Sequence, residues 1–81
     1  MNILYLITGL GGGGAEKVVA DLADQMFQHG HQVKIAYLKG EVVVRPENRE
    51  IELVYLGLES VKNSKSVYKK YKELLQKFQP D

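Results

Sequence analysis

The chain contains no cysteine and no tryptophan, and only two of its 81 residues are proline. The absence of cysteine excludes a disulfide scaffold, a thiolate zinc site and a cysteine nucleophile. Long hydrophobic runs are also missing: the longest one, Ile3 to Ile7, is far shorter than the about 20 residues of a membrane helix. The amino-terminal residues also lack the basic segment and long apolar stretch of a signal peptide. We therefore expect a cytoplasmic protein.

An excess of charge of one sign is absent as well. The 11 basic and 10 acidic side chains leave a net charge of +1, which gives no general electrostatic signature of nucleic-acid binding. The composition, 44% hydrophobic and 26% charged, is that of one small globular domain. The basic side chains are nevertheless concentrated near the carboxyl end, where residues 61–81 hold six lysines against Glu73 and Asp81.

In the first half of the chain, the hydrophobic pattern changes from that of a strand to that of a helix. Residues 3–7 form a continuous apolar run, which is typical of a strand that is buried on both faces of a parallel sheet. A glycine-rich stretch follows, and Gly30 then ends a predicted amphipathic helix. The apolar side of that helix is expected to consist of Ala15, Val18, Val19, Leu22, Ala23, Met26 and Phe27.

The second half repeats the alternation of strand and helix. Residues 33–38 and 51–56 are predicted strands, and the connection between them has a further short strand as an option at Val42 to Val44. A second helix is predicted from Asn63 or Ser64 until Pro80 ends it. Its apolar face is expected to consist of Val67, Tyr71, Leu74, Leu75 and Phe78.

Strands that alternate with helices predict an α/β fold, here a partial Rossmann-like three-layer arrangement. Right-handed crossovers put the three parallel strands in the order 3-2-1 and carry the second helix to the opposite face of the sheet. The fourth strand of such a fold is missing, so we expect residues 1–81 to be a truncated domain, the front of a longer protein. Such a fragment is expected to dimerise through the exposed edge of strand 3–7.

The glycine-rich stretch is the main candidate functional motif. Residues 9–14 satisfy the pattern G-x-G-x-x-G between a predicted strand and a predicted helix, where backbone N–H groups can face a phosphate. A tight turn without a ligand is the competing interpretation. Ala15 and Glu16 exclude a Walker A loop, which needs lysine and a hydroxyl residue there. A dinucleotide site needs an acidic residue at the end of the second strand, and Glu41, slightly beyond that end, is only a possible substitute.

The order of several short motifs resembles the amino terminus of a family 4 glycosyltransferase. The resemblance covers essentially the whole chain. It rests on residues 1–8, the glycines 11–14, Gly13-Gly14-Ala15-Glu16, Val18-Val19-x-x-Leu22-Ala23, His29-Gly30-His31-x-Val33 and Phe78-x-Pro80-Asp81.

This resemblance implies a retaining GT-B enzyme with two Rossmann-like domains, which moves a sugar from a nucleotide-sugar donor to a glycan or lipid-linked acceptor. It implies polysaccharide, lipopolysaccharide or glycolipid biosynthesis for the parent protein, without a metal ion or other cofactor. By motif match, the segment that approaches the donor diphosphate consists of Gly11, Gly12, Gly13 and Gly14, with Glu16 at the start of the helix. The second half of the domain and the carboxyl-terminal domain, with its pair of glutamates separated by seven residues, are absent from this sequence. The isolated chain is therefore expected to be inactive.

No catalytic residue is assigned within the chain. His29 and His31 flank a helix end and a strand entry, and a structural role is expected for both. The tyrosines, including Tyr68 and Tyr71, are expected to pack in the core. One face of the second predicted helix is rich in lysine, and we interpret it as exposed to solvent. The alternative hypothesis is that this face contacts an anionic inner membrane surface. The lysine face consists of Lys62, Lys65, Lys69 and Lys72. Two different functions stay open for the whole chain, namely an NAD(P)-binding oxidoreductase domain and a non-catalytic binding or assembly module.

Overall fold

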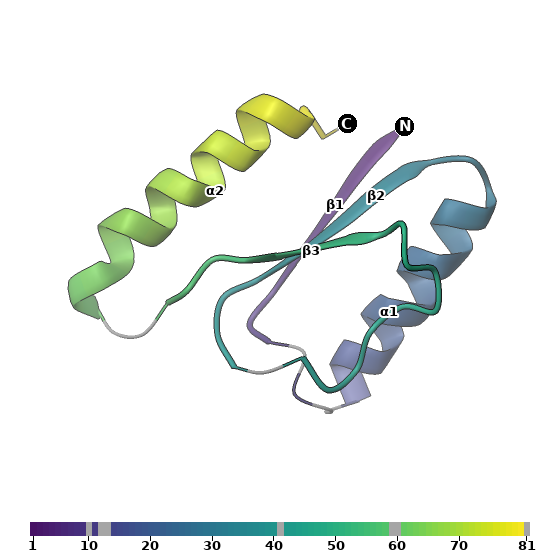
Figure 1. Cartoon of the computed structure of the whole chain (residues 1–81), viewed down its shortest axis with the longest axis horizontal. Helices are drawn as coiled ribbons and strands as arrows, with labels where there is room; N and C mark the ends of the chain where they lie inside the picture. Colours follow the sequence, from purple (N-terminus) through teal and green to yellow (C-terminus); the bar gives the residue numbers. More distant parts are fainter. Residues whose placement is uncertain (10, 12–13, 41, 59–60, 81) are drawn as a thin grey trace.

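The computed structural model describes residues 1–9, 11, 14–40, 42–58 and 61–80. Three strands form a sheet that has one long helix on each side (Figure 1). The elements in chain order are β1 (Asn2–Ile7), α1 (Gly14–Gln28), β2 (Gln32–Tyr37), β3 (Glu52–Tyr55), a 3-10 turn (Val61–Asn63) and α2 (Ser64–Phe78). Each of the three strands and two helices predicted from the sequence is thereby confirmed. The optional short strand at 42–44 is wrong, because these residues form no strand.

The sheet is parallel throughout and has the order β1-β2-β3, as predicted. In its register Ile3 lies opposite Val33, and Ile35 lies opposite Leu53. β2 is therefore the central strand, with a neighbour on each side. The chain has an α/β fold that is consistent with part of a Rossmann-like fold.

The side chains of the strands alternate between two separate hydrophobic clusters. On the α1 side, Ile35 and Val33 of β2 pack with Ala23 and Ile51. On the α2 side, Ala36 of the same strand packs in a second cluster. The buried members of that cluster are Ala36, Leu56, Val67, Leu74 and Phe78. The continuous apolar runs in the sequence therefore supply both faces of one sheet, as expected for parallel strands.

The helix α1 contacts the sheet through small residues. Ala20 and Ala23 are its buried side chains, and the absence of bulk lets its backbone approach β1 and β2 closely. The predicted apolar face is correct for Val19, Met26 and Phe27, which pack half-buried against this cluster. It is wrong for Ala15, Val18 and Leu22, which are exposed, Val18 by 57%. The predicted apolar face of α1 is therefore wider than the part of the helix that contacts the three-stranded sheet.

The helix α2 contacts the opposite face through large residues, as predicted for Val67, Leu74 and Phe78. At its carboxyl end the side-chain amide of Asn2 donates a hydrogen bond of 2.8 Å to the carbonyl oxygen of Phe78. This bond joins the end of α2 to the start of β1, and the two chain ends lie near one another (Figure 1). The predicted crossover of α2 to the face opposite α1 is confirmed.

The connection from β2 to β3 is held against α1 by one carboxylate. Asp24 accepts hydrogen bonds from the backbone N–H groups of Glu47 and Asn48, at 2.8 and 3.0 Å, and from the Asn48 side-chain amide at 3.1 Å. Pro46 is buried beside them. These contacts order a segment that has no regular secondary structure.

Candidate functional site

The carboxyl ends of the three strands meet at one edge of the sheet, the usual ligand-binding edge of open parallel α/β folds. Backbone hydrogen bonds continue past the strands and hold this edge together. The N–H groups of Leu38 and Lys39 donate to the carbonyl oxygen of Thr8, at 3.1 and 2.9 Å, and the N–H of Leu58 donates to the carbonyl of Leu38 at 2.6 Å. The chain segments after β1, β2 and β3 therefore form one continuous backbone surface.

Gly9, the first glycine of the motif, is required by packing within the protein. A Cβ atom at this position would lie 2.8 Å from the carbonyl oxygen of Lys39, closer than real Cβ contacts allow. Only glycine lets the segments after β1 and β2 approach this closely. The turn interpretation of the motif therefore accounts for Gly9.

Packing does not explain Gly11 and Gly14. A Cβ atom at either position would meet no atom of the described residues within 4 Å. Their backbone conformation does not require glycine either, because the described glycines with positive φ are Gly30, Gly40 and Gly57. Gly11 is exposed, and Gly14 is the first residue of α1. Open space therefore lies against the backbone just before the helix begins. Gly12 and Gly13 lie outside the described residues.

Glu16 lies in the first turn of α1 and is half-buried. A negative charge there stabilises the helix through its dipole. The carboxylate can also accept hydrogen bonds from hydroxyl groups of a ligand at the start of the helix. The structure thus places Gly11, Gly14 and Glu16 together at the junction of the glycine segment and α1.

The end of β2 provides none of the acidic side chains that a dinucleotide site requires. Leu38, Lys39 and Gly40 follow this strand, and the predicted substitute Glu41 lies outside the described residues. Lys39 and Gly40 are exposed at the edge of the sheet.

An apolar groove adjoins the carboxyl edge on the α2 side. Its volume is about 260 Å³. It lies between the ends of β1 and β2 and the start of α2, and it is lined by Leu6, Leu38, Leu56, Leu58, Ser64, Val67, Tyr68 and Tyr71. Leu6 and Tyr68 are its exposed hydrophobic members, 46% and 66% accessible respectively. The prediction that Tyr68 packs in the core is therefore wrong. Its position on α2 is turned away from the buried stripe, whereas Tyr71 lies half-buried within that stripe.

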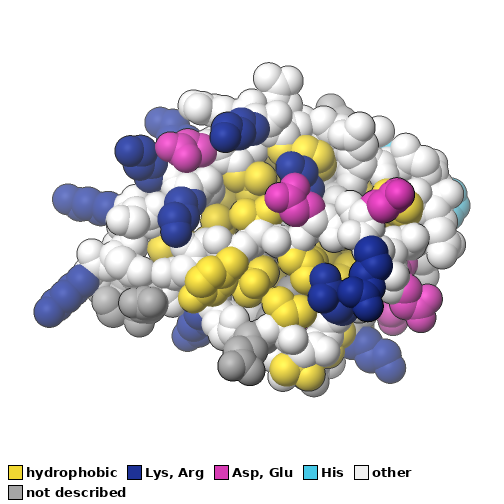
Figure 2. Space-filling view, viewed as in Figure 1, with side chains coloured by type: hydrophobic (Ala, Val, Ile, Leu, Met, Phe, Trp, Pro, Cys, Tyr) yellow, Lys and Arg dark blue, Asp and Glu magenta, His cyan; other side chains and the backbone are white. Residues whose placement is uncertain are grey.

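Lysines occupy the solvent side of α2. Lys65, Lys69 and Lys72 are exposed, and Lys62 is exposed in the preceding 3-10 turn. Figure 2 shows basic side chains projecting from the part of the molecule that α2 forms, with hydrophobic side chains visible beside them. The exposed ring of Tyr68 lies on the same helix.

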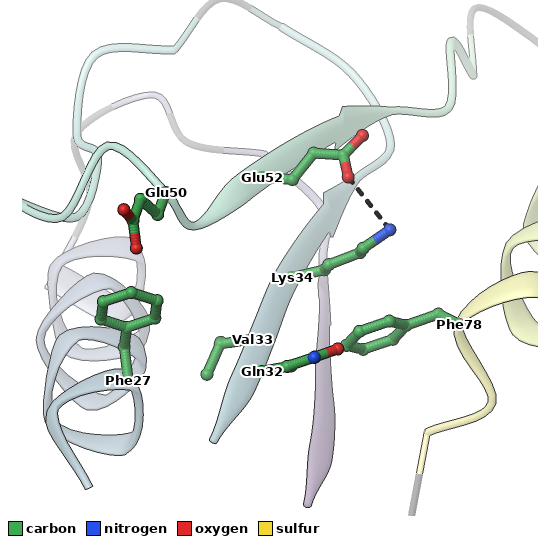
Figure 3. Close-up of a pocket in the computed structure, with 7 residues that line it drawn as sticks. All are labelled: Phe27, Gln32, Val33, Lys34, Glu50, Glu52 and Phe78. Atoms are coloured by element: carbon green, nitrogen blue, oxygen red, sulfur yellow. Dashed lines mark ion pairs between the residues drawn. The ribbon is translucent and has the colours of Figure 1, made fainter. Parts of the chain in front are cut away.

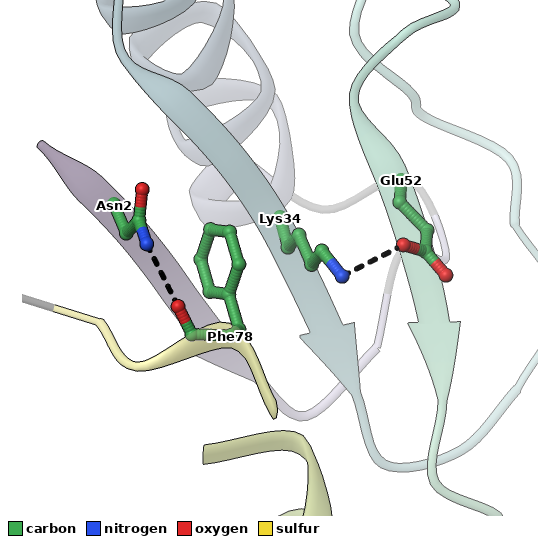
Figure 4. Close-up of polar contacts among 4 residues, drawn as sticks. All are labelled: Asn2, Lys34, Glu52 and Phe78. Carbon is green, nitrogen blue, oxygen red and sulfur yellow. Dashed lines mark hydrogen bonds and ion pairs between the residues drawn. The ribbon is translucent and has the colours of Figure 1, made fainter. Parts of the chain in front are cut away.

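A hollow of about 230 Å³ lies at the opposite, amino-terminal edge of the sheet (Figure 3). Two of its three charged side chains, Lys34 and Glu52, pair with one another, and the third is Glu50. The Nζ atom of Lys34 lies 3.0 Å from a carboxylate oxygen of Glu52 and 4.8 Å from the centre of the Phe78 ring. Figure 4 shows these groups beside the Asn2 contact to α2. The hollow is a junction between β2, β3 and the end of α2.

Both histidines also belong to this amino-terminal edge. The Nδ1 atom of His29 lies 2.7 Å from the carbonyl oxygen of Gln25, and the Nδ1 atom of His31 lies 3.2 Å from the terminal amino group of Met1. His29 follows the end of α1 and His31 precedes β2. These contacts fit the structural role predicted for both residues, since neither lies at the carboxyl edge.

Two further findings concern only the part of the chain that the structure describes. No helix there is long and apolar enough to cross a membrane. No group of three His, Cys, Asp or Glu side chains there is arranged to hold a metal ion.

Sequence reasoning missed the contact that requires Gly9 and the role of Asp24. Neither has a local signal, because each depends on a segment that is distant in the sequence. Comparison of the chain with models of protein families, with curated proteins and with solved structures finds no match.

Proposed function

We propose that this chain is the first part of the amino-terminal Rossmann-like domain of a retaining, family 4-like glycosyltransferase. The parent protein would transfer a sugar from a nucleotide-sugar to a glycan or lipid-linked acceptor, in the cytoplasm, during polysaccharide or lipopolysaccharide biosynthesis. The observation that carries this proposal is the glycine segment after β1, because neither packing nor backbone conformation explains Gly11 and Gly14.

The chemistry of this segment suits a diphosphate. The first N–H groups of α1 have no partner within the helix, and together with the helix dipole they favour an anion. Side chains on Gly11 or Gly14 would occupy the space through which a phosphate approaches the backbone. Glu16 offers a carboxylate to the hydroxyl groups of a sugar attached to that phosphate. A nucleotide-sugar combines both groups in one molecule.

The chain by itself holds only one side of such a site. Transfer requires donor and acceptor to be fixed together, and the glycine segment contacts only the donor in this proposal. We assign no catalytic residue among the 81 and expect no sugar transfer from the isolated chain.

Titration of the backbone amides tests the proposed anion site directly. The amide signals of Gly11 and Gly14 are expected to shift with UDP-glucose or GDP-mannose, and those of Gly30 and Gly57 are the internal controls. A Gly11→Val variant has room to fold but covers the backbone, so its Gly14 shift should be lost. Shifts with NAD⁺ alone would instead favour an oxidoreductase domain, which the absence of an acidic residue in 38–40 disfavours.

The gene gives a second, independent test of the parent protein. Translation of the source locus past the codon for Asp81 should continue into an apolar strand and, later, the glutamate pair of the family. A stop codon directly after Asp81 would contradict the enzyme proposal and favour a binding or assembly module.

We further propose that the lysine face of α2 lets the parent protein contact an anionic membrane surface peripherally. The supporting observation is Tyr68, which is exposed on the helix that carries Lys65, Lys69 and Lys72. Lysines attract anionic headgroups, while an amphipathic ring suits the interface.

Sedimentation with phosphatidylglycerol vesicles tests this contact. The chain should bind at low salt, and replacement of Lys65, Lys69 and Lys72 by glutamine should abolish binding. Replacement of the exposed residues Lys17, Arg45 and Arg49 by glutamine removes the same charge elsewhere and should leave binding unchanged. Equal losses in both variants would show that only net charge matters.

A further inference from the structure

Lys39 follows β2, the central strand, which has β1 on one side and β3 on the other. The N–H of Lys39 donates a hydrogen bond of 2.9 Å to the carbonyl oxygen of Thr8, the residue just before the glycine segment. Figure 1 shows the chain leaving β1 and β2 at the same end of the sheet. The backbone of Lys39 is thus fixed beside the start of the glycine segment.

The contact with Gly9 brings the two segments very close together. A Cβ atom on Gly9 would lie 2.8 Å from the carbonyl oxygen of Lys39. Gly11 is only two residues further along, a distance of at most about 7 Å in an extended chain. The side chain of lysine has a flexible four-carbon stem, and its ammonium group can cover most of this distance. A phosphate beside Gly11 therefore lies within reach of Lys39.

The ammonium group of Lys39 is free to bind a ligand. The side chain is exposed, and among the residues that the structure describes no hydrogen-bond or ion-pair partner holds it. Lys34, five residues earlier, is already paired with Glu52 at 3.0 Å. The two lysines of this segment thus differ: one holds two strands together, and the other has no such role.

Lys39 also determines the charge of the carboxyl edge. It is the only charged side chain among the described residues that directly follow the three strands, at 8–9, 11, 38–40 and 56–58. At the start of α1, Glu16 and Lys17 carry opposite charges, which cancel. The edge therefore has one uncompensated positive charge beside the glycine segment, and Lys39 carries it.

We propose that Lys39 binds the diphosphate of the nucleotide-sugar, together with the N–H groups at the start of α1. This inference rests on the proposed function, because it adds a side chain to the same donor site. Backbone N–H groups are dipoles, whereas an ammonium group is a full charge and forms stronger, charge-assisted hydrogen bonds to phosphate. Lys39 thereby makes the site select a ligand that carries a diphosphate over the uncharged nucleoside with the same base.

The chemistry of lysine also explains why this site differs from a dinucleotide site. In a dinucleotide site an acidic residue near this position accepts hydrogen bonds from the ribose hydroxyls. The ammonium group of lysine has three donors and no acceptor. Lys39 therefore suits the oxygens of a phosphate better than a pair of hydroxyls.

Titration followed through the amide signals of Gly11 and Gly14 measures the contribution of Lys39. Lys39→Gln should weaken the binding of UDP-glucose by about 3- to 10-fold, as expected for one exposed, charge-assisted contact. Lys39→Arg keeps the charge and should bind nearly as well as the unaltered chain. Lys77→Gln removes the same charge from an exposed position at the other end of the sheet and is the matched control. Added salt should reduce the difference between Lys39→Gln and the unaltered chain.

The outcomes separate this inference from the proposed function. If the unaltered chain and Lys39→Gln bind UDP-glucose equally well, the glycine segment binds the donor and Lys39 takes no part. Equal weakening in Lys39→Gln and Lys77→Gln would trace the effect to net charge and overturn the inference. A Lys39→Arg variant as weak as Lys39→Gln would contradict a role based on charge. No shift of Gly11 and Gly14 in the unaltered chain would overturn both the inference and the proposed function.

Chemical labelling of lysines gives a second readout that needs no variant. An amine-acylating reagent should modify Lys39 more slowly when UDP-glucose is present, and uridine at the same concentration should not slow it. The exposed residues Lys69 and Lys77 are the internal controls, and their labelling should stay unchanged with either ligand. Unchanged labelling of Lys39, at a concentration of UDP-glucose that shifts Gly11, would refute the contact.

Discussion

The two faces of the sheet are covered by helices of equal length but held in different ways. On one face α1 approaches the strands closely through Ala20 and Ala23, and Asp24 holds the connection from β2 to β3 with three hydrogen bonds. On the other face α2 reaches the strands through Val67, Leu74 and Phe78, and Asn2 holds its carboxyl end. Close backbone packing thus contrasts with contact through long side chains.

This difference arises from how each helix is connected. α1 joins two neighbouring strands, so its place is restricted at both ends by short segments. α2 follows the edge strand β3 and crosses the sheet to the start of β1. There the side chain of Asn2 donates a hydrogen bond to the carboxyl end of α2. We infer that the α1 face resists perturbation as a rigid unit and that the α2 face adjusts more readily.

The largest expected effect comes from cavities on the two faces. Ile35→Ala on the α1 side and Leu56→Ala on the α2 side should each lower the free energy of unfolding by about 2–5 kcal/mol. Both side chains are fully buried. Ile35→Ala should cost more, because the central strand cannot collapse into the cavity whereas α2 can move inward.

Urea unfolding at one fixed protein concentration measures both losses. The exposed Val43→Ala is the control and should change stability by less than about 0.5 kcal/mol. Equal losses at Ile35 and Leu56 would contradict the contrast between a rigid and an adjustable face.

A smaller effect is expected from the hydrogen bonds that fasten each face. Asp24→Ala removes three hydrogen bonds and should cost about 1–2 kcal/mol, and Asn2→Ala, which removes the bond to Phe78, should cost about 0.5–1.5 kcal/mol. Hydrogen exchange should locate the consequences: faster exchange in 46–50 for the first variant and at the end of α2 for the second. Uniformly faster exchange in either variant would show that the two faces are not separate units.

The hydrogen bonds of Asp24 should make the stability of the α1 face depend on pH. Burial raises the pKa of Asp24, but hydrogen bonds from Asn48 and Glu47 outweigh it and hold the pKa below the ordinary value of 3.8. The unfolded chain therefore binds the proton more tightly than the folded chain. The ionised carboxylate of Asp24 therefore stabilises the folded chain above pH 3.8. This contribution is lost as the pH falls below 3.8 and passes the pKa that Asp24 has in the folded chain.

Unfolding of the chain and of Asp24→Asn between neutral and acid pH measures this contribution. The difference in stability between the two should shrink as the pH falls below 3.8. A difference that stays constant to lower pH would show that ionisation of Asp24 does not stabilise the α1 face.

The smallest effect is expected at the ion pair on the α2 side. Lys34 and Glu52 are partly exposed, so the pair should contribute less than about 1 kcal/mol. Lys34→Met keeps the alkyl chain beside Phe78 and removes the charge. A double-mutant cycle with Glu52→Gln isolates the interaction, which should weaken as salt is added. A coupling independent of salt would contradict a screened surface pair.

The sequence predicted most of the fold because its signals are local. The apolar runs at 3–7, 33–38 and 51–56 and the helical periods between them place each element to within about two residues. The errors lie where neighbours decide burial. Val18 and Leu22 match the period of α1 but extend beyond the width of the sheet, and Tyr68 lies just outside the buried stripe of α2.

For the candidate site the sequence identified the glycine segment but could not separate the roles of its members. All five glycines in 9–14 have the same local signal. Only the approach of Lys39, thirty residues away along the chain, shows that Gly9 serves packing and that Gly11 and Gly14 do not. A contact between segments that are distant in sequence leaves no trace in a local pattern.

The sequence by itself determined the kind and order of the elements, the parallel sheet and the position of the glycine segment after the first strand. These follow from hydrophobic period and chain connectivity, which are properties of short segments and their succession. The tertiary structure decided which glycines face open space, which side chain lies beside them and how each helix is fastened. Those properties depend on distances between remote segments, and such distances are set only when the strands and helices pack together.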